Sequence, residues 1–257
     1  MIVTLLTDFG TRDYFTGAMK GVILSLEPAV QLVDITHEVP AQDIVAAGFN
    51  LVACYKDFPR GTVHVSVVDP GVGSDRRAIL AVTPEYYFVA PDNGLLSLVY
   101  AAEPELKVFH LNKERFFRAP MSNTFHGRDV FAPVAGWLAK GAQPAEMGDE
   151  ITDFVRFEIA VPKPLGENTW QGEVLHIDRF GNCVTNFDEQ LLPAGFHLEV
   201  NGVRVSKMQK FYAEAEDDRP FMIMGSAGFL EIAAFKGSAA KILGIETGEK
   251  ILVHLDS

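Results

Sequence analysis

The chain has 257 residues, of which 48% are hydrophobic and 22% charged, and its formal net charge is −12 at pH 7. This composition is that of a folded globular protein and excludes a disordered chain. The negative charge repels phosphate backbones and anionic lipids, so we expect neither a nucleic acid nor a membrane as a partner.

Strands and helices alternate along the first part of the chain. Apolar runs rich in β-branched residues predict buried strands over residues 2–7, 30–35 and 63–68. Apolar residues at helical spacing predict helices over residues 15–26, 44–55 and 129–140. A hairpin is predicted over residues 79–82 and 86–89, and a further strand over residues 108–111. The alternation of strands and helices predicts a mainly parallel α/β sheet.

The pattern changes in the last part of the chain. From Phe154 onward, short alternating strands are separated by turn residues, and Asn201-Gly202 is a strong hairpin signal. Residues 161–166 have the composition of a linker. The sequence therefore predicts an α/β domain over residues 1–160 and a small C-terminal β-barrel or sandwich domain over residues 167–257.

Two further features bear on location. The chain has no apolar run near the roughly 20 residues that a membrane span requires, and no signal-peptide pattern at its start. Cys54 and Cys183 lie far apart and in no metal-ligand spacing. We expect reduced thiols in a cytoplasmic protein.

Polar clusters follow three of the predicted strands, where open α/β sheets bind ligands. Asp8, in the first cluster, is equally suited to capping the next helix and to touching a ligand. Asp34 and His37, in the second, favour a structural or solvated role, because two residues are a weak metal signal. In the third, Asp69 precedes glycines and Arg76, which suggests a carboxylate kept ionised by a cation, or alternatively a structural ion pair.

Further candidates lie later in the chain. His126, beside Gly127 at a polar helix entry, could act as a base or be an ordinary loop residue. Asp178 and Asn182 end a predicted strand with side chains suited to amide or hydroxyl groups, and a simple turn would leave Asp178 unexplained. Ser226 does not lie in a Gly-x-Ser-x-Gly elbow and is not a credible serine nucleophile.

Seven motifs follow one another along nearly the whole chain: Thr7–Gly10, Thr36–Pro40, Val68–Gly73 with Arg76, Ala90–Leu95, Thr124–Gly127, Asp178–Asn182 and Phe229–Ile232. With these motifs the sequence resembles the S-adenosyl-L-methionine hydroxide adenosyltransferases, relatives of the fluorinases and chlorinases. The resemblance implies an N-terminal α/β domain with a C-terminal β-barrel. It also implies homotrimers with sites between one subunit's N-terminal domain and a neighbour's C-terminal domain.

The resemblance implies that water or hydroxide attacks the 5′ carbon of the ribose of S-adenosyl-L-methionine, leaving adenosine and L-methionine. This small molecule is the substrate, and we expect no cofactor and no metal. The family's Asp–Arg–His set falls on Asp69, Arg76 and His126, and either Asp69 or His126 could take the proton. The residues that the resemblance places against substrate are Asp8 at the ribose, Asp178 and Asn182 at the methionine portion and adenine edge, Tyr212 at adenine, Ser226 near the methionine end, and Phe125 and Gly127.

The sequence departs from the halogenases at Gln42 and Ala227, where they carry Trp and Arg. Gly127 also lacks the hydroxyl that fluorinases place there, and Asp69 replaces a neutral Tyr. An anionic carboxylate repels a halide and accepts a hydrogen bond from water, so we expect hydrolysis.

Three other functions stay open from the sequence. They are a halide adenosyltransferase on the same fold, a non-catalytic protein that binds S-adenosylmethionine or adenosine, and a metal hydrolase using His37, His64 or His126.

Overall fold

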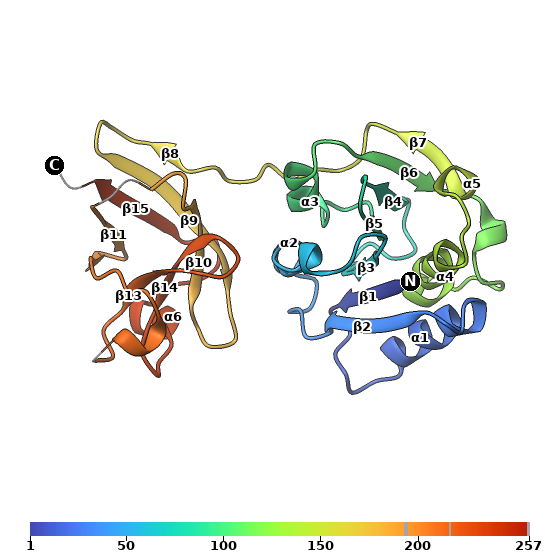
Figure 1. Cartoon of the computed structure of the whole chain (residues 1–257), viewed down its shortest axis with the longest axis horizontal. Helices are drawn as coiled ribbons and strands as arrows, with labels where there is room; N and C mark the ends of the chain where they lie inside the picture. Colours follow the sequence, from blue (N-terminus) through green and yellow to red (C-terminus); the bar gives the residue numbers. More distant parts are fainter. Residues whose placement is uncertain (193–194, 216, 256–257) are drawn as a thin grey trace. The chain divides into compact units, whose positions relative to one another are not determined.

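The computed structural model describes residues 1–192, 195–215 and 217–255. The chain divides into two compact units, Met1–Glu158 and Ile159–Ser257 (Figure 1). The first is an α/β unit and the second a nearly closed antiparallel, barrel-like sheet, which confirms the predicted fold class. No helix among the described residues is long and apolar enough to cross a membrane.

Seven strands of the described residues form the sheet of the first unit, in the order β2-β1-β3-β5-β4-β6-β7. Their bounds are β1 Ile2–Thr7, β2 Gln31–Thr36, β3 Val63–Val67, β4 Ala78–Val82, β5 Tyr87–Pro91, β6 Lys107–Leu111 and β7 Gly148–Ile151. Strand β1 is parallel to β2 and β3, and β3 is parallel to β5. The pairs β4–β5, β4–β6 and β6–β7 are antiparallel. The prediction of a mainly parallel sheet was therefore wrong for the half of the sheet that contains β4, β6 and β7. The connection between β4 and β5 is a hairpin, which is too short for the crossover that parallel strands need.

Helices cover both faces of this sheet (Figure 1). Their bounds are α1 Phe15–Leu26, α2 Ile44–Val52, α3 Ser97–Ala102, α4 Ala132–Ala139 and α5 Pro144–Met147, with short turns η1 Tyr55–Asp57, η2 Glu114–Phe116 and η3 Gly127–Phe131. One core contains residues of α1 and α4, and the other contains residues of α2 and α3. Because both faces are covered, β1 and β3 are buried along almost their whole length and read as continuous apolar runs.

Two predicted helices differ from those observed. The helix predicted to reach Tyr55 ends at Val52, and Tyr55 starts the separate turn η1. The helix predicted from Asp129 begins instead with the π-helical turn η3, which α4 continues. Helices α3 and α5 and strand β7 were not predicted, because elements of four to six residues are too short for a repeated apolar pattern to stand out.

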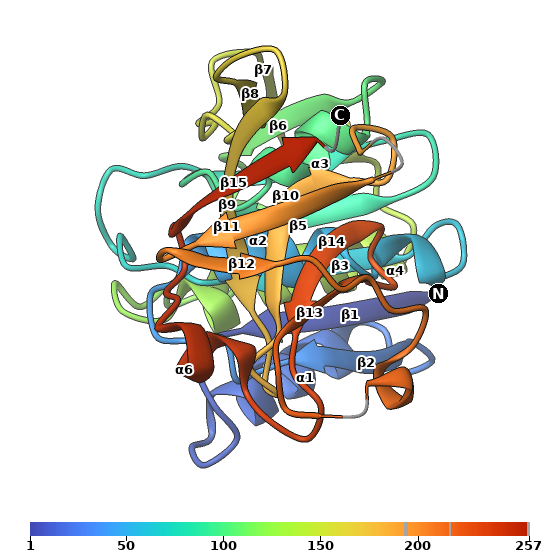
Figure 2. The same cartoon turned by 90° about the vertical axis from the view of Figure 1, so that its left-hand side faces the viewer.

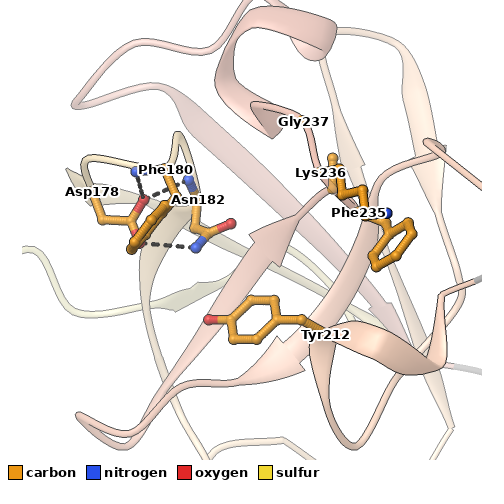
Figure 3. A pocket seen from close by; sticks show the side chains of 8 residues that line it. Asp178, Phe180, Asn182, Tyr212, Phe235, Lys236 and Gly237 are labelled. Carbon is orange, nitrogen blue, oxygen red and sulfur yellow. Dashed lines mark hydrogen bonds between the residues drawn. The ribbon is translucent and has the colours of Figure 1, made fainter.

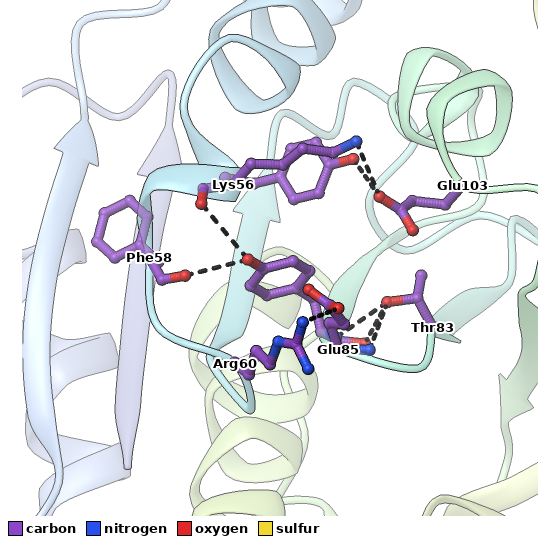
Figure 4. Close-up of polar contacts among 8 residues, drawn as sticks. Lys56, Phe58, Arg60, Thr83, Glu85 and Glu103 are labelled. Carbon is purple, nitrogen blue, oxygen red and sulfur yellow. Dashed lines mark hydrogen bonds and ion pairs between the residues drawn. The ribbon is translucent and has the colours of Figure 1, made fainter.

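A polar network ties the segment after α2 to the β4–β5 hairpin (Figure 4). The Tyr86 hydroxyl donates to the Phe58 carbonyl at 3.1 Å, and the Tyr55 hydroxyl donates to Glu103 at 2.5 Å. Arg60 pairs with Glu85 at 2.9 Å. These contacts fix the rim of an aromatic cluster that surrounds His64 of β3.

His64 has no exposed surface. Its ring stacks on Phe88 with centroids 5.2 Å apart, and its Nδ1 lies 2.8 Å from the Thr4 hydroxyl. Burial lowers the pKa of His64 from 6.5 to about 4. Between these values the unfolded chain binds the proton more readily than the folded chain, so stability present above pH 6.5 is lost as the pH falls towards 4.

We expect this histidine to cost the first unit up to about 3 kcal/mol of unfolding free energy over that pH interval. The measurement is urea unfolding in a Trp170→Phe background, where Trp137 fluorescence reports the first unit. Adding His64→Phe should flatten the dependence of stability on pH by this amount. An equal slope with and without His64 would contradict the assignment.

Eight strands of the described residues form the sheet of the second unit, along the path β12-β11-β15-β9-β10-β14-β13 with β8 beside β9. Their bounds are β8 Lys163–Pro164, β9 Thr169–Ile177, β10 Cys183–Asp188, β11 Phe196–Val200, β12 Val203–Val205, β13 Phe221–Met224, β14 Phe229–Ala233 and β15 Lys250–Leu255, with α6 Ala239–Leu243 and the turn η4 Tyr212–Glu214. Figure 2 faces this unit and shows β12, β11 and β15 side by side.

Two local predictions about the second unit meet the structure differently. The Asn201-Gly202 turn is confirmed: both residues have positive φ, 49° and 74°, and they join β11 to β12. Strands were predicted from Phe154 onward, but residues 153–162 form none. Within residues 161–166, predicted as a linker, Lys163 and Pro164 pair with β9.

Candidate active site

The candidate reactive side chains of the first unit lie near the point where the connections between its strands change direction. From β1 the chain passes through α1 to β2 on one side, and from β2 through α2 to β3 on the other. The position beyond the carboxyl ends of β1 and β3, where the connections diverge, is the usual ligand site of such sheets. Asp8 directly follows β1, and Asp69 follows the end of β3.

The structure brings Asp69, Arg76 and His126 together. Arg76 Nε donates to Asp69 Oδ1 at 2.9 Å, and the second guanidinium arm contacts Oδ2, so the ion pair is bidentate. The same guanidinium lies 2.9 Å from His126 Nδ1 and stacks over the Phe131 ring. The side chains of Asp69 and Arg76 are only 5% and 10% exposed. Arg76 therefore joins a buried carboxylate to an imidazole.

The hydrogen bond from Arg76 fixes the protonation state of His126. A guanidinium has only donors, so Nδ1 accepts and the proton of the neutral ring lies on Nε2. Burial, and after it the charge of Arg76, lower the pKa of His126, although the carboxylates of Asp69 and Asp129 oppose them. His126 therefore offers an N–H donor at Nε2, and its other nitrogen is already occupied.

Gly73 allows the Asp69 loop to pack on the His126 loop. Its φ is 78°, and a Cβ there would lie 2.2 Å from the Asn123 carbonyl oxygen. Ser74 closes the turn by donating to the Gly71 carbonyl at 2.6 Å. The absence of a side chain at Gly73 thus allows the backbone at Asn123, in a neighbouring loop of the same unit, to approach closely.

Asp129 organises the loop that precedes His126, and sequence reasoning missed it. It is fully buried, accepts from Arg128 at 2.6 and 2.9 Å, and accepts from the Ser122 amide at 2.8 Å. Burial raises the pKa of Asp129, but hydrogen bonds from Arg128, Ser122 and Arg118 outweigh it and the pKa is lowered. Asp129 lies in the π turn η3, a distortion frequent at functional sites.

Asp8 does not cap α1, whose N-cap is Tyr14. Its Oδ2 accepts a hydrogen bond from the backbone N–H of Gln42 at 2.9 Å. Gln42 has φ of 67°, a conformation uncommon for a residue with a side chain, and its amide is thereby presented to Asp8. The carboxylate is therefore fixed at the end of β1.

Phe125 and Gly127 lie in packed surroundings. Phe125 is buried in the core beside Phe15, with ring centroids 5.1 Å apart. A Cβ on Gly127 would lie 3.1 Å from Met19 Sδ and 3.3 Å from the Phe9 ring. Both residues flank His126 in the sequence and pack the segment that carries it against the core.

Two other predicted features have structural partners. The His37 Nδ1 lies 2.9 Å from the Thr7 hydroxyl, and its Nε2 lies 3.0 Å from Asp34. In the motif Ala90–Leu95, the buried Asp92 accepts from Arg77 and from the Val155 amide, both at 2.8 Å. Among the described residues, no group of three or more His, Cys, Asp or Glu side chains is arranged to hold a metal ion.

The second unit contains a cavity of about 600 Å³ (Figure 3). Its lining comprises Asp178, Phe180, Asn182, Tyr212, Ala234, Phe235, Lys236 and Gly237. Three of the residues predicted to bind substrate thus line one cavity, and the residues from 234 to 237 were missed because they carry no motif. Ser226 is exposed on the turn between β13 and β14 and does not belong to this lining.

Asp178 holds the turn that presents Asn182. Its Oδ1 accepts from the amides of Phe180 and Asn182 at 2.9 and 2.8 Å, and its Oδ2 accepts from Asn182 Nδ2 at 2.8 Å. The expectation that a turn would leave Asp178 unexplained was wrong. Because Nδ2 is directed to Asp178, the amide oxygen of Asn182 points away from it, towards the cavity (Figure 3).

Comparisons with known proteins place this arrangement in context. Residues 3–148 match the sequence pattern of the SAM hydroxide adenosyltransferase N-terminal domain, and residues 172–252 match that of the C-terminal domain. A protein of Thermus thermophilus named (R)-S-adenosyl-L-methionine hydrolase is 38% identical, with 96% of each chain covered. A crystal structure of an uncharacterized conserved protein from Thermotoga maritima superimposes with a TM-score of 0.91 at 33% identity, over 99% of this chain and all of that one. A fluorinase of an Actinoplanes species is more distant, at 24% identity over 98% of this chain and 97% of its own.

Proposed function

The chain belongs to the SAM hydroxide adenosyltransferase family, and we propose that it hydrolyses S-adenosyl-L-methionine to adenosine and L-methionine. The observation that carries this proposal is the buried Asp69–Arg76–His126 arrangement beyond the carboxyl end of β3. It offers one anionic acceptor and one neutral N–H donor, which is the pair of groups that a water nucleophile needs.

The reaction joins the oxygen of water to the 5′ carbon and breaks the bond from that carbon to sulfur. The electrons of the broken bond return to sulfur, which becomes the neutral thioether of methionine. Asp69 accepts the proton that the water loses, because His126 Nδ1 is occupied by Arg76 and its Nε2 already carries hydrogen. His126 orients the water by donating to it from Nε2. Positive charge disappears from sulfur in this step, so a partly desolvated site favours it.

The remaining predicted residues have recognition roles in this proposal. Asp8 accepts hydrogen bonds from the ribose hydroxyls. The oxygen of Asn182 accepts from the exocyclic amino group of adenine, and Tyr212 packs on the base. Ser226 lies near the methionine end, and Asp178 acts through Asn182.

We further propose a homotrimer with sites formed between subunits. What supports it is the family resemblance and the fact that Asp69 and Tyr212 belong to different units of the chain. Cys54 and Cys183 are free thiols, and burial raises the pKa of both. On that basis we propose a cytoplasmic location.

The test is product analysis in oxygen-18 water. We expect adenosine with the label in its 5′ hydroxyl, together with unlabelled L-methionine. The same products should form at high chloride or fluoride, because the carboxylate of Asp69 disfavours an anionic nucleophile. Activity should also persist in chelator. A 5′-halogenated nucleoside would show a halide adenosyltransferase, and tight binding without any turnover would show a binding protein.

A further inference from the structure

Tyr212 lies in a short turn between Gln209, whose amide bonds to Met222 of β13, and Ala215, which is buried against the sheet. Tyr212 starts the three-residue turn η4 between β12 and β13, and the residue is 45% exposed. Within this segment the Glu214 amide donates to the Phe211 carbonyl at 3.1 Å, and Glu214 accepts from the Lys210 amide at 2.8 Å. These bonds shape the turn but do not attach the ring to the sheet.

Two contacts attach the ring to the sheet: an edge contact with the Phe221 ring of β13, with centroids 6.4 Å apart, and a hydrogen bond of the Tyr212 hydroxyl. The hydroxyl donates to Glu231 Oε2 at 3.0 Å, across the edge of the cavity that the ring lines. Figure 3 shows the ring lying along the cavity with its hydroxyl directed away from the turn that carries it. The bond therefore holds an exposed ring at both ends.

Glu231 is suited to be the fixed partner. It lies in the middle of β14, paired with Val184 of β10 and Ile223 of β13, and is only 8% exposed. A Cβ on Gly225 would lie 1.9 Å from Glu231 Oε1, so the absence of a side chain at Gly225 makes room for the carboxylate. Burial raises the pKa of Glu231, the bond from Tyr212 opposes this, and the charge of Asp178 raises it further. Burial of a carboxyl group costs free energy unless the group is hydrogen-bonded, and the Tyr212 hydroxyl supplies such a bond to Glu231.

We propose that Glu231 is a positioning residue that fixes the ring of Tyr212 along the cavity, so that a flat face is ready for a nucleobase. The inference rests on the proposed function for the identity of that base. Preorganisation of this kind increases affinity by removing the entropy lost when a mobile ring is ordered on binding. It should act on substrate binding and leave the chemical step unchanged.

The experiment compares Tyr212→Phe, Glu231→Gln, Glu231→Ala and the double variant Tyr212→Phe/Glu231→Ala, with Tyr87→Phe in the other unit as a control for loss of a phenol. We expect Tyr212→Phe to raise KM for S-adenosylmethionine and Kd for adenosine roughly three- to tenfold, with kcat within about twofold. Glu231→Gln keeps an acceptor and should stay near the wild type. Glu231→Ala should resemble Tyr212→Phe, and the double variant should be no worse than either.

Two results would overturn the proposal: wild-type adenosine affinity in Tyr212→Phe, or losses that add in the double variant. Calorimetric binding of adenosine needs no turnover, so it separates this inference from a failure of the proposed reaction. If adenosine does not bind to the wild type, fluorotyrosine at position 212 still gives a ligand-free test. Its fluorine resonance should narrow to that of a freely rotating ring in Glu231→Ala, and an unchanged resonance would contradict the attachment.

Discussion

The Asp69→Asn variant is expected to lose about 10²–10⁴-fold in kcat, while the Kd of a non-reacting substrate analogue changes little. The amide cannot take the proton that the attacking water loses, and His126 cannot replace it because its acceptor nitrogen is held by Arg76. The measurement is single-turnover formation of adenosine, which isolates the chemical step from product release.

The matched control is Asp34→Asn in the same unit. Asp34 also pairs with a cation and a histidine, Lys20 and His37, but its carboxylate is 40% exposed and lies outside the reactive cluster. That variant should retain near wild-type turnover. An Asp69→Asn enzyme that folds and keeps its single-turnover rate would remove Asp69 from the mechanism.

Replacing Arg76 by Met is expected to lower kcat by about 10²–10³-fold and the unfolding free energy of the first unit by about 3–5 kcal/mol. The rate falls because both Asp69 and His126 lose the group that orients them. Stability falls because the variant leaves a buried carboxylate without its cation. Loss of the positive charge should also raise the pKa of His126 towards its ordinary value of 6.5.

The pH profile separates these effects. In the wild type, activity should hold through pH 6.5 on the acid side and fall only below it, where His126 takes a proton and Nδ1 can no longer accept. The residual activity of Arg76→Met should fall at a higher pH. Arg77→Met is the control, since Arg77 binds Asp92 and Asp153 instead: it should destabilise the unit without moving the acid limb. Identical profiles for wild type and Arg76→Met would contradict the coupling.

Long, strongly patterned elements could be predicted from the sequence. The runs at β1 and β3 and the spacing in α1 carry full periods, and parallel strands place their ends at one edge of a sheet. For this reason Asp8 and Asp69 could be expected on one edge before any coordinates. Strand β7, with the sequence Gly-Asp-Glu-Ile, could not be foreseen, because its first three residues disfavour strands and only Ile151 favours one.

The parts of the site that escaped prediction depend on contacts between distant segments. Gly73 is required because Asn123 lies against it, and this contact cannot be predicted from the sequence. Asp129 organises its loop because Arg118 and the Ser122 amide both donate to it, and no motif indicates these bonds. The tautomer of His126 likewise follows from where one guanidinium points. Sequence motifs name the reacting side chains, but their protonation states arise from three-dimensional neighbours.

In the π turn η3, the number of residues matters separately from which residues they are. It spans Gly127–Phe131, and the Ala132 amide bonds back to the Gly127 carbonyl, so the segment holds one residue more per turn than an α-helix would. In an uninterrupted α-helix, one added residue would rotate everything that precedes it by about 100° around the helix axis. The wide turn absorbs the added residue locally, so Val134 and Leu138 keep their places in the core while His126 stays beside Arg76. The extra residue therefore lets the imidazole and the core helix each keep its own position.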